Sequence, residues 1–582
     1  MTDAPEYLTP TILDSRRLFG PNLFDQRAGA VLDVECSDAD GRRAVAAWPA
    51  EARTLATALG WTDTHCATQS SHGSARLFLS APLDGLLTAT DLSEYAWAAA
   101  EAHAAQQPVA DATSLLRESY TRERQALPHL VAISEYARQH GLSFSLDDDG
   151  CSVGSGVGVR VVAHTDVAVD DATEFDDTWD AALDVPVALV TGSNGKTTTT
   201  RLVAAMWRAS GRVTGMCCSD GVWRGAEQLA SGDYTGPAGA RRVLCDRQVE
   251  AVVLETARGG MLRRGLALNQ VHGAVITNIS ADHFGEHGVE TLEDLAHVKA
   301  IVARALRPGA ALVLNADDES LRQLAATLDV PVVWFSVRDH GWTHDEPTPA
   351  VTVRHDRLLL RRERKWHDLG AVRQMPITLG GNARHNVANA AAAALLASVV
   401  GVPVNAIRDA LSTFGASPAD NPGRLMIRTV GGVTVVMDYA HNPEGMASLC
   451  RTAATIPATR RLLLLGQAGN RDDDQLRALA ATAWLTQPFD RVIIKEMPGM
   501  LRGREPDEVP GVLTAGLVAA GASADIVALA PSEYDGVCAA LRWAHNGDVL
   551  VLGVHVERER VLALMDRLAA HGWNAGHAVP TG

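Results

Sequence analysis

An apolar segment that runs directly into a glycine-rich turn and then a helix constrains this chain more than any other feature. Residues 185–190 are typical of a buried strand, Thr-Gly-Ser-Asn-Gly-Lys follows at 191–196, and a helical pattern begins at Lys196. The two glycines let the backbone curl so that successive N–H groups point at phosphate oxygens. Lys196 suits the outer phosphates, and the Thr197 hydroxyl suits Mg²⁺. The pattern predicts a nucleotide-phosphate loop; the alternative is a glycine turn that only caps a helix.

Apolar strands and amphipathic helices alternate through most of the chain that follows. Apolar residues recur at helical spacing in 196–210 and 292–306, and one earlier helical stretch is expected at 92–107. The strand candidates form two groups, 185–192, 249–256, 272–280 and 309–315, then 433–438, 461–466, 491–495 and 548–554. Alternation of this kind predicts the α/β fold class, with mostly parallel sheets covered by helices on both faces.

Three domains are expected. At 582 residues the chain exceeds what one ordinary core can bury. The acidic stretch 165–184, rich in small residues, marks one boundary, and Pro422 lies at the second. We therefore expect an N-terminal α+β domain with its linker at 1–184, a central domain with a doubly wound sheet at 185–421, and a Rossmann-like α/β domain at 422–582.

Composition excludes several classes of function. The formal net charge of −17 disfavours a nucleic-acid partner, because phosphate backbones attract basic surfaces. No apolar run approaches the ~20 residues that span a bilayer, and the first ten residues lack a basic region followed by an apolar stretch, so neither a membrane segment nor a secretory signal is expected. The eight cysteines form no CxxC pair. A cytoplasmic protein is expected, and its oligomeric state stays open.

A carboxylate at the end of the second expected strand is the first metal-ligand candidate. Glu255 closes the apolar run 249–256, and that end of a parallel strand faces the ligand crevice of a doubly wound sheet. Glu255 and Thr197 would then share a Mg²⁺ ion with the nucleotide phosphates. The alternative is a solvated glutamate at a strand end.

Further short motifs follow the loop in a fixed order and together point to one family. They are Leu-Asn-Ala-Asp-Asp at 314–318, His-Asn-Val-Ala-Asn at 385–389, Asn-Pro-Gly-Arg at 421–424 and Asp-Tyr-Ala-His-Asn-Pro at 438–443. Each alone is weak; Asn-Ala-Asp-Asp, for example, also favours an Asx turn. Their order, and the short Gly-Ser-Asn-Gly-Lys-Thr loop, resemble the Mur ligase superfamily, whose members join a carboxylate to an amine at the expense of ATP.

The resemblance implies roles for particular residues. It assigns ATP binding to Gly192, Ser193, Asn194, Gly195, Lys196, Thr197, Thr198, Asn315, Asp317, Asn386, Arg424, Asp438 and His441. It assigns two Mg²⁺ ions to Thr197, Glu255, His283 and Lys299, and catalysis to Lys196, Lys299 and His283. In the family a lysine at the place of Lys299 is carbamylated, and a carbamate gives a metal an anionic oxygen where an ammonium would repel it.

Some segments resemble the Mur-like half of cyanophycin synthetases more specifically. They are 235–237, 254–263, 280–283, 294–299 and 494–504, with a fainter likeness at 17–24. Tentative substrate contacts are Arg258, Arg471, Lys495, Glu496, Arg502 and Arg504.

The sequence departs from that family in two ways. The stretch 165–184 directly precedes the loop, so no ATP-grasp domain is expected there. Met-Pro-Gly-Met at 497–500 replaces an acidic loop, so arginine is not carried over as the amine substrate.

The reaction expected is transfer of the ATP γ-phosphate to a carboxylate, followed by attack of an amine on the acyl phosphate and release of phosphate. The partners expected are small amino acids or peptides, with ATP and Mg²⁺. Two alternatives remain: a phosphate-loop NTPase or kinase, and a catalytically silent relative that binds a polymer or a synthetase. Within the ligases, a folate-polyglutamylating or peptidoglycan-precursor enzyme also remains open.

Overall fold

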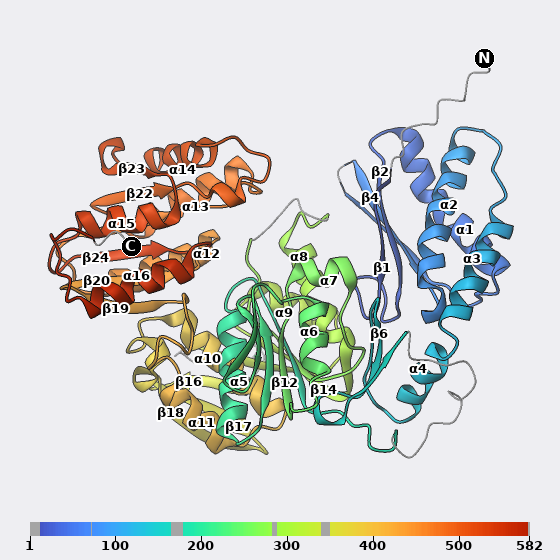
Figure 1. Cartoon of the computed structure of the whole chain (residues 1–582), viewed down its shortest axis with the longest axis horizontal. Coiled ribbons are helices and arrows are strands. Elements are labelled where there is room, and N and C mark those ends of the chain that lie inside the picture. Colours follow the sequence, from blue (N-terminus) through green and yellow to red (C-terminus); the bar gives the residue numbers. More distant parts are fainter. Residues whose placement is uncertain (1–11, 72, 165–178, 282–287, 339–349, 580–582) are drawn as a thin grey trace.

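An eleven-stranded sheet forms the middle of the molecule within residues 12–71, 73–164, 179–281, 288–338 and 350–579, the part of the chain that the computed structural model describes (Figure 1). At its centre β8 (Val187–Thr191) lies between β12 (Ala251–Glu255) and β13 (Val271–Ile276), and all three run parallel. Every residue of β8 and β12 is buried. The residues of central strands form continuous apolar runs because helices cover both faces of the sheet.

Each face of this sheet has its own apolar core. On one face pack α5 (Lys196–Ala209), α10 (Arg384–Val399) and α11 (Val404–Thr413). On the other pack α6 (Pro237–Leu244), α7 (Arg258–Arg264), α8 (Leu292–Lys299) and α9 (Glu319–Ala325). The α10 helix buries the alanines at 390–394, whose small side chains let it lie close to α5 and the sheet. This doubly wound arrangement confirms the predicted fold class.

The C-terminal part contains a six-stranded sheet within the described residues. Its order is β19 (Met426–Val430), β20 (Val433–Asp438), β24 (Val549–Gly553), β21 (Arg461–Leu465), β22 (Arg491–Lys495) and β23 (Val527–Ala530). Only the β19–β20 pair is antiparallel. The helices α12 (Pro443–Ala454), α13 (Asp473–Thr486) and α14 (Glu508–Ala519) cover one face, and α15 (Glu533–Trp543) and α16 (Arg558–Ala570) cover the other.

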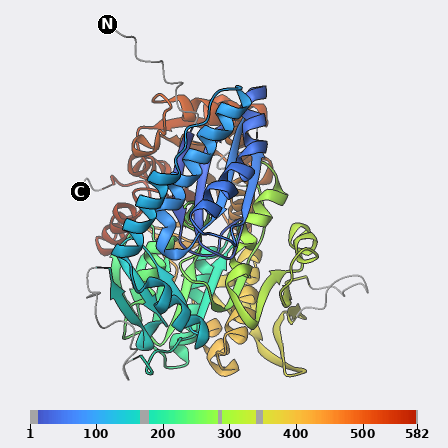
Figure 2. The same ribbon diagram turned by 90° about the vertical axis from the view of Figure 1, so that its right-hand side faces the viewer.

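The N-terminal part is an α+β unit. Its four-stranded antiparallel sheet has the order β1 (Ile12–Leu18), β2 (Gly29–Glu35), β4 (Ser74–Ser80) and β3 (Cys66–Ser71). The helices α1 (Ala39–Ala58), α2 (Leu86–Ala104) and α3 (Thr113–Ala126) form its outer layer, away from the rest of the molecule (Figures 1 and 2). A smaller sheet, β5 (Phe144–Leu146), β6 (Gly150–Val153) and β7 (Arg160–Ala163), lies beside it with α4 (Leu130–Gln139). No described helix is both long and apolar enough to cross a membrane.

Two helices differ from the sequence prediction for physical reasons. The helix expected at 92–107 begins at Leu86, because the Glu123 carboxylate of α3 accepts the free N–H groups of Leu87 and Thr88, both at 2.8 Å. The helix expected at 292–306 ends at Lys299, continues as a 3₁₀ turn, and gives way to β14 (Leu306–Asn315). The first outcome depends on a contact with α3, and in the second Leu306 pairs with Val271 of β13; a local pattern contains neither.

The N-terminal part contacts the central one at α7. The Phe19 N–H donates to the Arg264 carbonyl at 3.1 Å, and the Leu266 N–H donates to the Pro21 carbonyl at 2.8 Å. The Arg264 guanidinium also lies over the Phe19 ring, 5.8 Å from its centre. The segment after β1 thus fixes α7, the helix that follows β12 and Glu255.

Candidate functional site

The turn between β8 and α5 has the tight geometry that its glycines allow. Gly192 has φ +146° and Gly195 has φ +82°. A Cβ atom at Gly192 would lie 1.9 Å from Oγ1 of Thr277, and one at Gly195 would lie 2.1 Å from Oδ1 of Asn389. Both positions therefore need glycine for backbone conformation and for space.

The segment that follows β13 holds this turn in place. Asn278 accepts the Asn194 N–H on Oδ1 at 2.9 Å and returns a hydrogen bond from Nδ2 to the Asn194 carbonyl at 3.0 Å. The Thr277 hydroxyl donates to the same carbonyl at 2.6 Å, and the Ser193 hydroxyl donates to the Ser280 carbonyl at 3.1 Å. Thr277 and Asn278 were not among the predicted site residues, because their role depends on the neighbouring strand.

Two lysines converge on the turn. Lys196 Nζ donates to the carbonyls of Gly192 and Ser193 at 3.1 and 3.0 Å, and Lys299 Nζ donates to the Gly192 carbonyl at 2.9 Å. Lys299 is only 4% exposed, although it ends an amphipathic helix. Lys299 thus lies at the phosphate turn, and its catalytic and metal-binding roles stay predictions. His283 lies outside the described residues.

A buried carboxylate and two hydroxyls lie beside the first turn of α5. The Ser219 N–H donates to Oε2 of Glu255 at 3.2 Å, and the hydroxyl oxygens of Thr197 and Ser219 are 3.0 Å apart. Burial raises the pKa of Glu255, while the charges of Lys196 and Arg424 act in the opposite direction. Oxygen ligands of this kind suit Mg²⁺, which binds few protein groups and keeps waters and phosphate oxygens for the rest. The described residues contain no cluster of three or more His, Cys, Asp or Glu that could hold a metal.

The C-terminal part reaches across to the phosphate turn through polar side chains. The hydrogen bonds run from Asn421 Nδ2 to Thr198 Oγ1 (3.1 Å), from Arg424 Nη2 to Ser219 Oγ (3.0 Å) and from Asn442 Nδ2 to Asn194 Oδ1 (2.9 Å). An ion pair of 2.5 Å between Arg558 and the buried Asp220 joins the same two parts. Asn442 and Ser219 had no predicted role.

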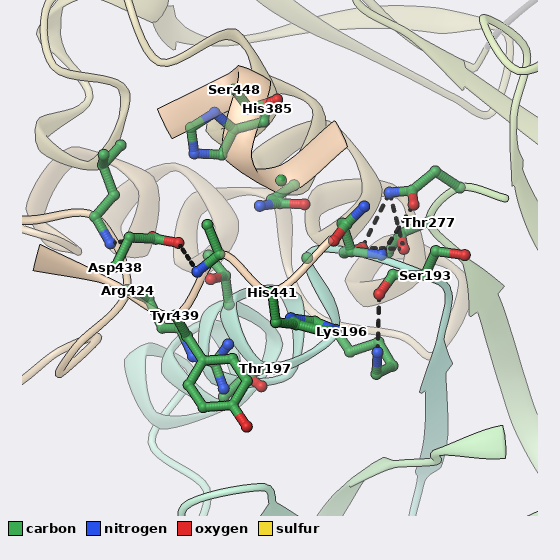
Figure 3. Close-up of a pocket in the computed structure, with 18 of the residues that line it drawn as sticks. Ser193, Lys196, Thr197, Thr277, His385, Arg424, Asp438, Tyr439, His441 and Ser448 are labelled. Carbon is green, nitrogen blue, oxygen red and sulfur yellow. Dashed lines mark hydrogen bonds between the residues drawn. The ribbon is translucent and has the colours of Figure 1, made fainter. Parts of the chain in front are cut away.

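Between the two parts lies a cavity of about 320 Å³ (Figure 3). The phosphate turn forms one wall, and Asn315, His385 and Asn386 extend it on the central side. Arg424, Asp438, Tyr439 and His441 line the C-terminal side, and Figure 3 labels these four around Lys196 and Thr197. The volume and the mixed polar lining suit a nucleotide whose phosphates lie on the turn.

Several lining residues also shape the cavity walls. The Asp438 carboxylate accepts the N–H groups of Leu425 at 2.6 Å and Ala440 at 2.7 Å, which fixes the loop that carries His441. Asn315 donates from Nδ2 to the Thr277 carbonyl at 3.2 Å. The cavity lining does not include the Asp317 carboxylate, which instead accepts from Ser336 and from the Val337 N–H. Burial lowers the pKa of His385 to about 4.

A second cavity, of about 410 Å³, adjoins the first and shares Lys196 with it. Its lining includes Lys299, Arg258, Arg263 and His441, with Asp233 as the one described carboxylate. Arg258 and Arg263 come from α7, the helix that the N-terminal part fixes. Cations gathered beside the phosphate turn suit a carboxylate-bearing ligand.

The remaining tentative substrate residues lie in the C-terminal part, and most of them contact other residues of that part. Lys495 is buried against Glu533. Glu496 accepts the N–H groups of Met497 and Asp507 at 2.9 and 2.7 Å. Arg504 pairs with Asp473 and Glu508 and donates to the Arg471 carbonyl at 2.7 Å. Arg502 is exposed, with a left-handed backbone at φ +53°. A substrate role for these residues stays a prediction.

Comparison with known proteins agrees with this geometry. Residues 190–397 match the Mur ligase middle domain, and residues 423–554 match the Mur ligase glutamate ligase domain. Cyanophycin synthetase of Trichormus variabilis is 35% identical over 337 residues, which are 57% of this chain and 37% of that relative. The chain thus spans well under half of the length of that protein.

More distant relatives also match. The UDP-N-acetylmuramoyl-L-alanyl-D-glutamate–2,6-diaminopimelate ligase of Thermosynechococcus vestitus is 29% identical over 321 residues, 52% of this chain and 60% of that relative. Among solved structures, E. coli FolC in complex with ADP has a TM-score of 0.48 and 19% identity, covering 66% of this chain and 89% of that one.

Proposed function

Because the chain belongs to the Mur ligase superfamily, as both matched domains show, we propose that it is an ADP-forming ligase that joins the carboxylate of a small amino acid or peptide to an amine. One observation carries the proposal. The phosphate turn, the buried Glu255 and the cationic Arg424 meet around one cavity, and a second, cation-lined cavity shares Lys196 with it. A nucleotide and a carboxylate would therefore bind in adjoining cavities that both contain Lys196.

ATP occupies the first cavity in this proposal. The backbone N–H groups of the turn and the Lys196 ammonium bind the phosphates, and Arg424 approaches them from the C-terminal part. Thr197 and Glu255 would hold Mg²⁺, which supplies positive charge against the phosphate oxygens. The part of the cavity that remains for the nucleoside is lined by Asn315, His385 and Asn386.

The carboxylate substrate occupies the second cavity, beside Arg258 and Arg263. Its oxygen attacks the γ-phosphorus, the bond to the β-phosphate oxygen breaks, and ADP leaves. The amine then attacks the acyl carbon, loses a proton and expels inorganic phosphate. Lys196 lies where it can neutralise charge on the transferred phosphoryl group throughout the first step.

We also propose that Lys299 is carbamylated in the active protein. Its Nζ lies beside the Gly192 carbonyl and lines the second cavity together with Lys196. Two neighbouring ammonium groups repel a cation, whereas a carbamate on one of them presents oxygen ligands to a second Mg²⁺. The partner residue expected from the family, His283, lies outside the described residues.

The test is ADP release measured with pairs of substrates. Single amino acids are screened as amines against aspartate-containing dipeptides and short peptides as carboxylates, and the products are weighed by mass spectrometry. ADP release that requires both partners, with a product lighter by one water than their sum, supports the ligase. A phosphorylated acceptor without amide would instead support a kinase, and tight ATP binding without ADP release would support a silent relative.

A further inference from the structure

Three ionisable side chains form a buried cluster in the C-terminal part, close to the nucleotide cavity. Lys495 ends β22, Glu533 begins α15, and His555 follows β24. Lys495 and Glu533 are each 1% exposed. The Lys495 ammonium contacts the Glu533 carboxylate, donates to the Gly553 carbonyl at 2.7 Å and lies 3.0 Å from Nδ1 of His555. Buried ion pairs contribute little net stability compared with apolar side chains of the same size, so this cluster calls for another role.

The cluster fixes both the place and the tautomer of His555. The Glu533 carboxylate accepts the N–H groups of His555 at 2.7 Å, Val556 at 3.1 Å and Glu557 at 2.7 Å. Because an ammonium can only donate, Nδ1 of His555 must accept from Lys495, and the ring proton must be on Nε2. Burial and the Lys495 charge keep the pKa of His555 well below its usual value, so the ring stays neutral. Nε2 therefore donates to the Ala440 carbonyl, 3.3 Å away.

From Ala440 a chain of contacts leads to the phosphate turn. The His555 ring meets the Tyr439 ring edge-on, with 5.0 Å between their centres. The Arg424 guanidinium lies over the Tyr439 ring, 4.3 Å from its centre. Arg424 in turn donates to Ser219, whose N–H binds Glu255. Figure 3 shows Arg424 and Tyr439 next to Thr197 of the turn.

We propose that Lys495, Glu533 and His555 act as a positioning cluster that holds the Asp438–His441 loop and, through Tyr439, the Arg424 guanidinium against the phosphate turn. This inference rests on the proposed nucleotide site. It gives Lys495 a role in ATP binding from a distance, in place of the direct substrate contact that its sequence motif suggested. These side chains touch neither cavity and would act only through Ala440, Tyr439 and Arg424.

A pair of variants at one position separates positioning from simple packing. His555→Gln keeps an N–H donor near the place of Nε2, whereas His555→Phe keeps the ring contact with Tyr439 and loses the donor to Ala440. Leu568→Ala serves as a control, because Leu568 is fully buried in the same core but has no part in this chain of contacts. Lys495→Met removes the charge that sets the tautomer.

The measurement is the Kd of a non-hydrolysable ATP analogue with Mg²⁺, taken well below the unfolding temperature of every variant. We expect His555→Phe to weaken binding about three- to tenfold, the effect of one lost hydrogen bond, and His555→Gln to stay within about twofold of wild type. Leu568→Ala should lower the unfolding temperature without changing the Kd, and Lys495→Met should weaken binding at least as much as His555→Phe.

Equal Kd values for His555→Phe, His555→Gln and wild type would overturn the inference and leave the ligase proposal standing. So would a Leu568→Ala variant that weakens binding as much as His555→Phe, because the effect would then be loss of packing. If Lys495→Met does not fold, the Kd values of His555→Phe and His555→Gln still test the inference. A wild-type protein that binds no ATP analogue would overturn the proposed function and this inference together.

Discussion

The guanidinium of Arg424, at the entrance to the C-terminal part, donates a hydrogen bond of 3.0 Å to the Ser219 hydroxyl of the central part. Both residues line the nucleotide cavity, and the contact places a positive charge beside the buried Glu255 and the phosphate turn. A ligand bound in the cavity would therefore touch both parts of the molecule at once.

Replacing Arg424 should weaken ATP binding even when the charge is kept. We expect Arg424→Ala to raise the KM for ATP at least tenfold, about 1.4 kcal/mol or more. Arg424→Lys should recover only part of that loss, because a lysine lacks the planar group that covers Tyr439 and reaches Ser219. Arg428→Ala is the control, since Arg428 lies nearby in β19 and pairs with Asp566. A lysine variant equal to wild type would show that only the charge matters.

Lys196→Ala should abolish turnover and leave the fold intact. The ammonium is held beside the carbonyls of Gly192 and Ser193, where it can reach transferred phosphate, and loss of such a group commonly costs about 10²-fold or more in kcat. Steady-state ADP release and the thermal unfolding temperature, measured on one preparation, check both halves of this prediction. A near-normal rate would remove the turn from the catalytic site.

Lys299→Ala should be inactive, and short-chain carboxylates such as acetate or propionate should restore part of the activity. The added carboxylate would occupy the space of the missing carbamate and offer oxygen ligands in its place. The same salts should not rescue Lys196→Ala, whose missing group is a cation. Full activity of Lys299→Ala without any additive would exclude Lys299 from the site, and mass spectrometry of the intact wild-type protein checks the modification itself.

Stability should fall as the solution is acidified, in part through His385. Its pKa of about 4 in the folded protein lies below the ordinary value of 6.5, mainly because of burial and secondly because of the Arg451 charge. The unfolded chain therefore binds the proton more readily between these two pH values, and folding loses free energy as the pH falls from about 6.5 to about 4. His385→Asn should reduce the loss at pH 5 by on the order of 1–2 kcal/mol.

The check on His385 is the thermal unfolding temperature of wild type and variant at pH 7.5 and pH 5. The difference between the two pH values should be smaller for His385→Asn than for wild type. If the unfolding temperature falls equally in both proteins between pH 7.5 and pH 5, His385 keeps an ordinary pKa in the folded state.

Local patterns were enough to predict some features and insufficient for others. The phosphate turn and Glu255 were predictable, because strand, glycines, lysine and helix are contiguous and the carboxylate sits at a strand end. The partners that hold them were not. Asn278 and Ser219 act through contacts with residues far away in the sequence, and their own neighbours in the chain give no sign of it.

Lys495 is a second case in which the sequence motif was not enough to predict the contacts of a side chain. Its motif resembles a segment of cyanophycin synthetases, and a substrate contact was predicted for it. Its ammonium is nevertheless enclosed by Glu533 and His555, which lie 38 and 60 positions further along the chain. Whether a charged side chain can be buried depends on the partners that the fold places around it, and a sequence motif does not contain those partners.

The central claim, ligation through an acyl phosphate, is tested most directly by an isotope transfer. A carboxylate substrate found in the ADP-release screen is labelled with ¹⁸O on both oxygens, and the inorganic phosphate released during turnover is analysed by mass spectrometry. The account predicts one ¹⁸O atom in each phosphate, carried over when the amine displaces the acyl phosphate. Phosphate that contains no ¹⁸O, released at the same rate as ADP, would contradict it.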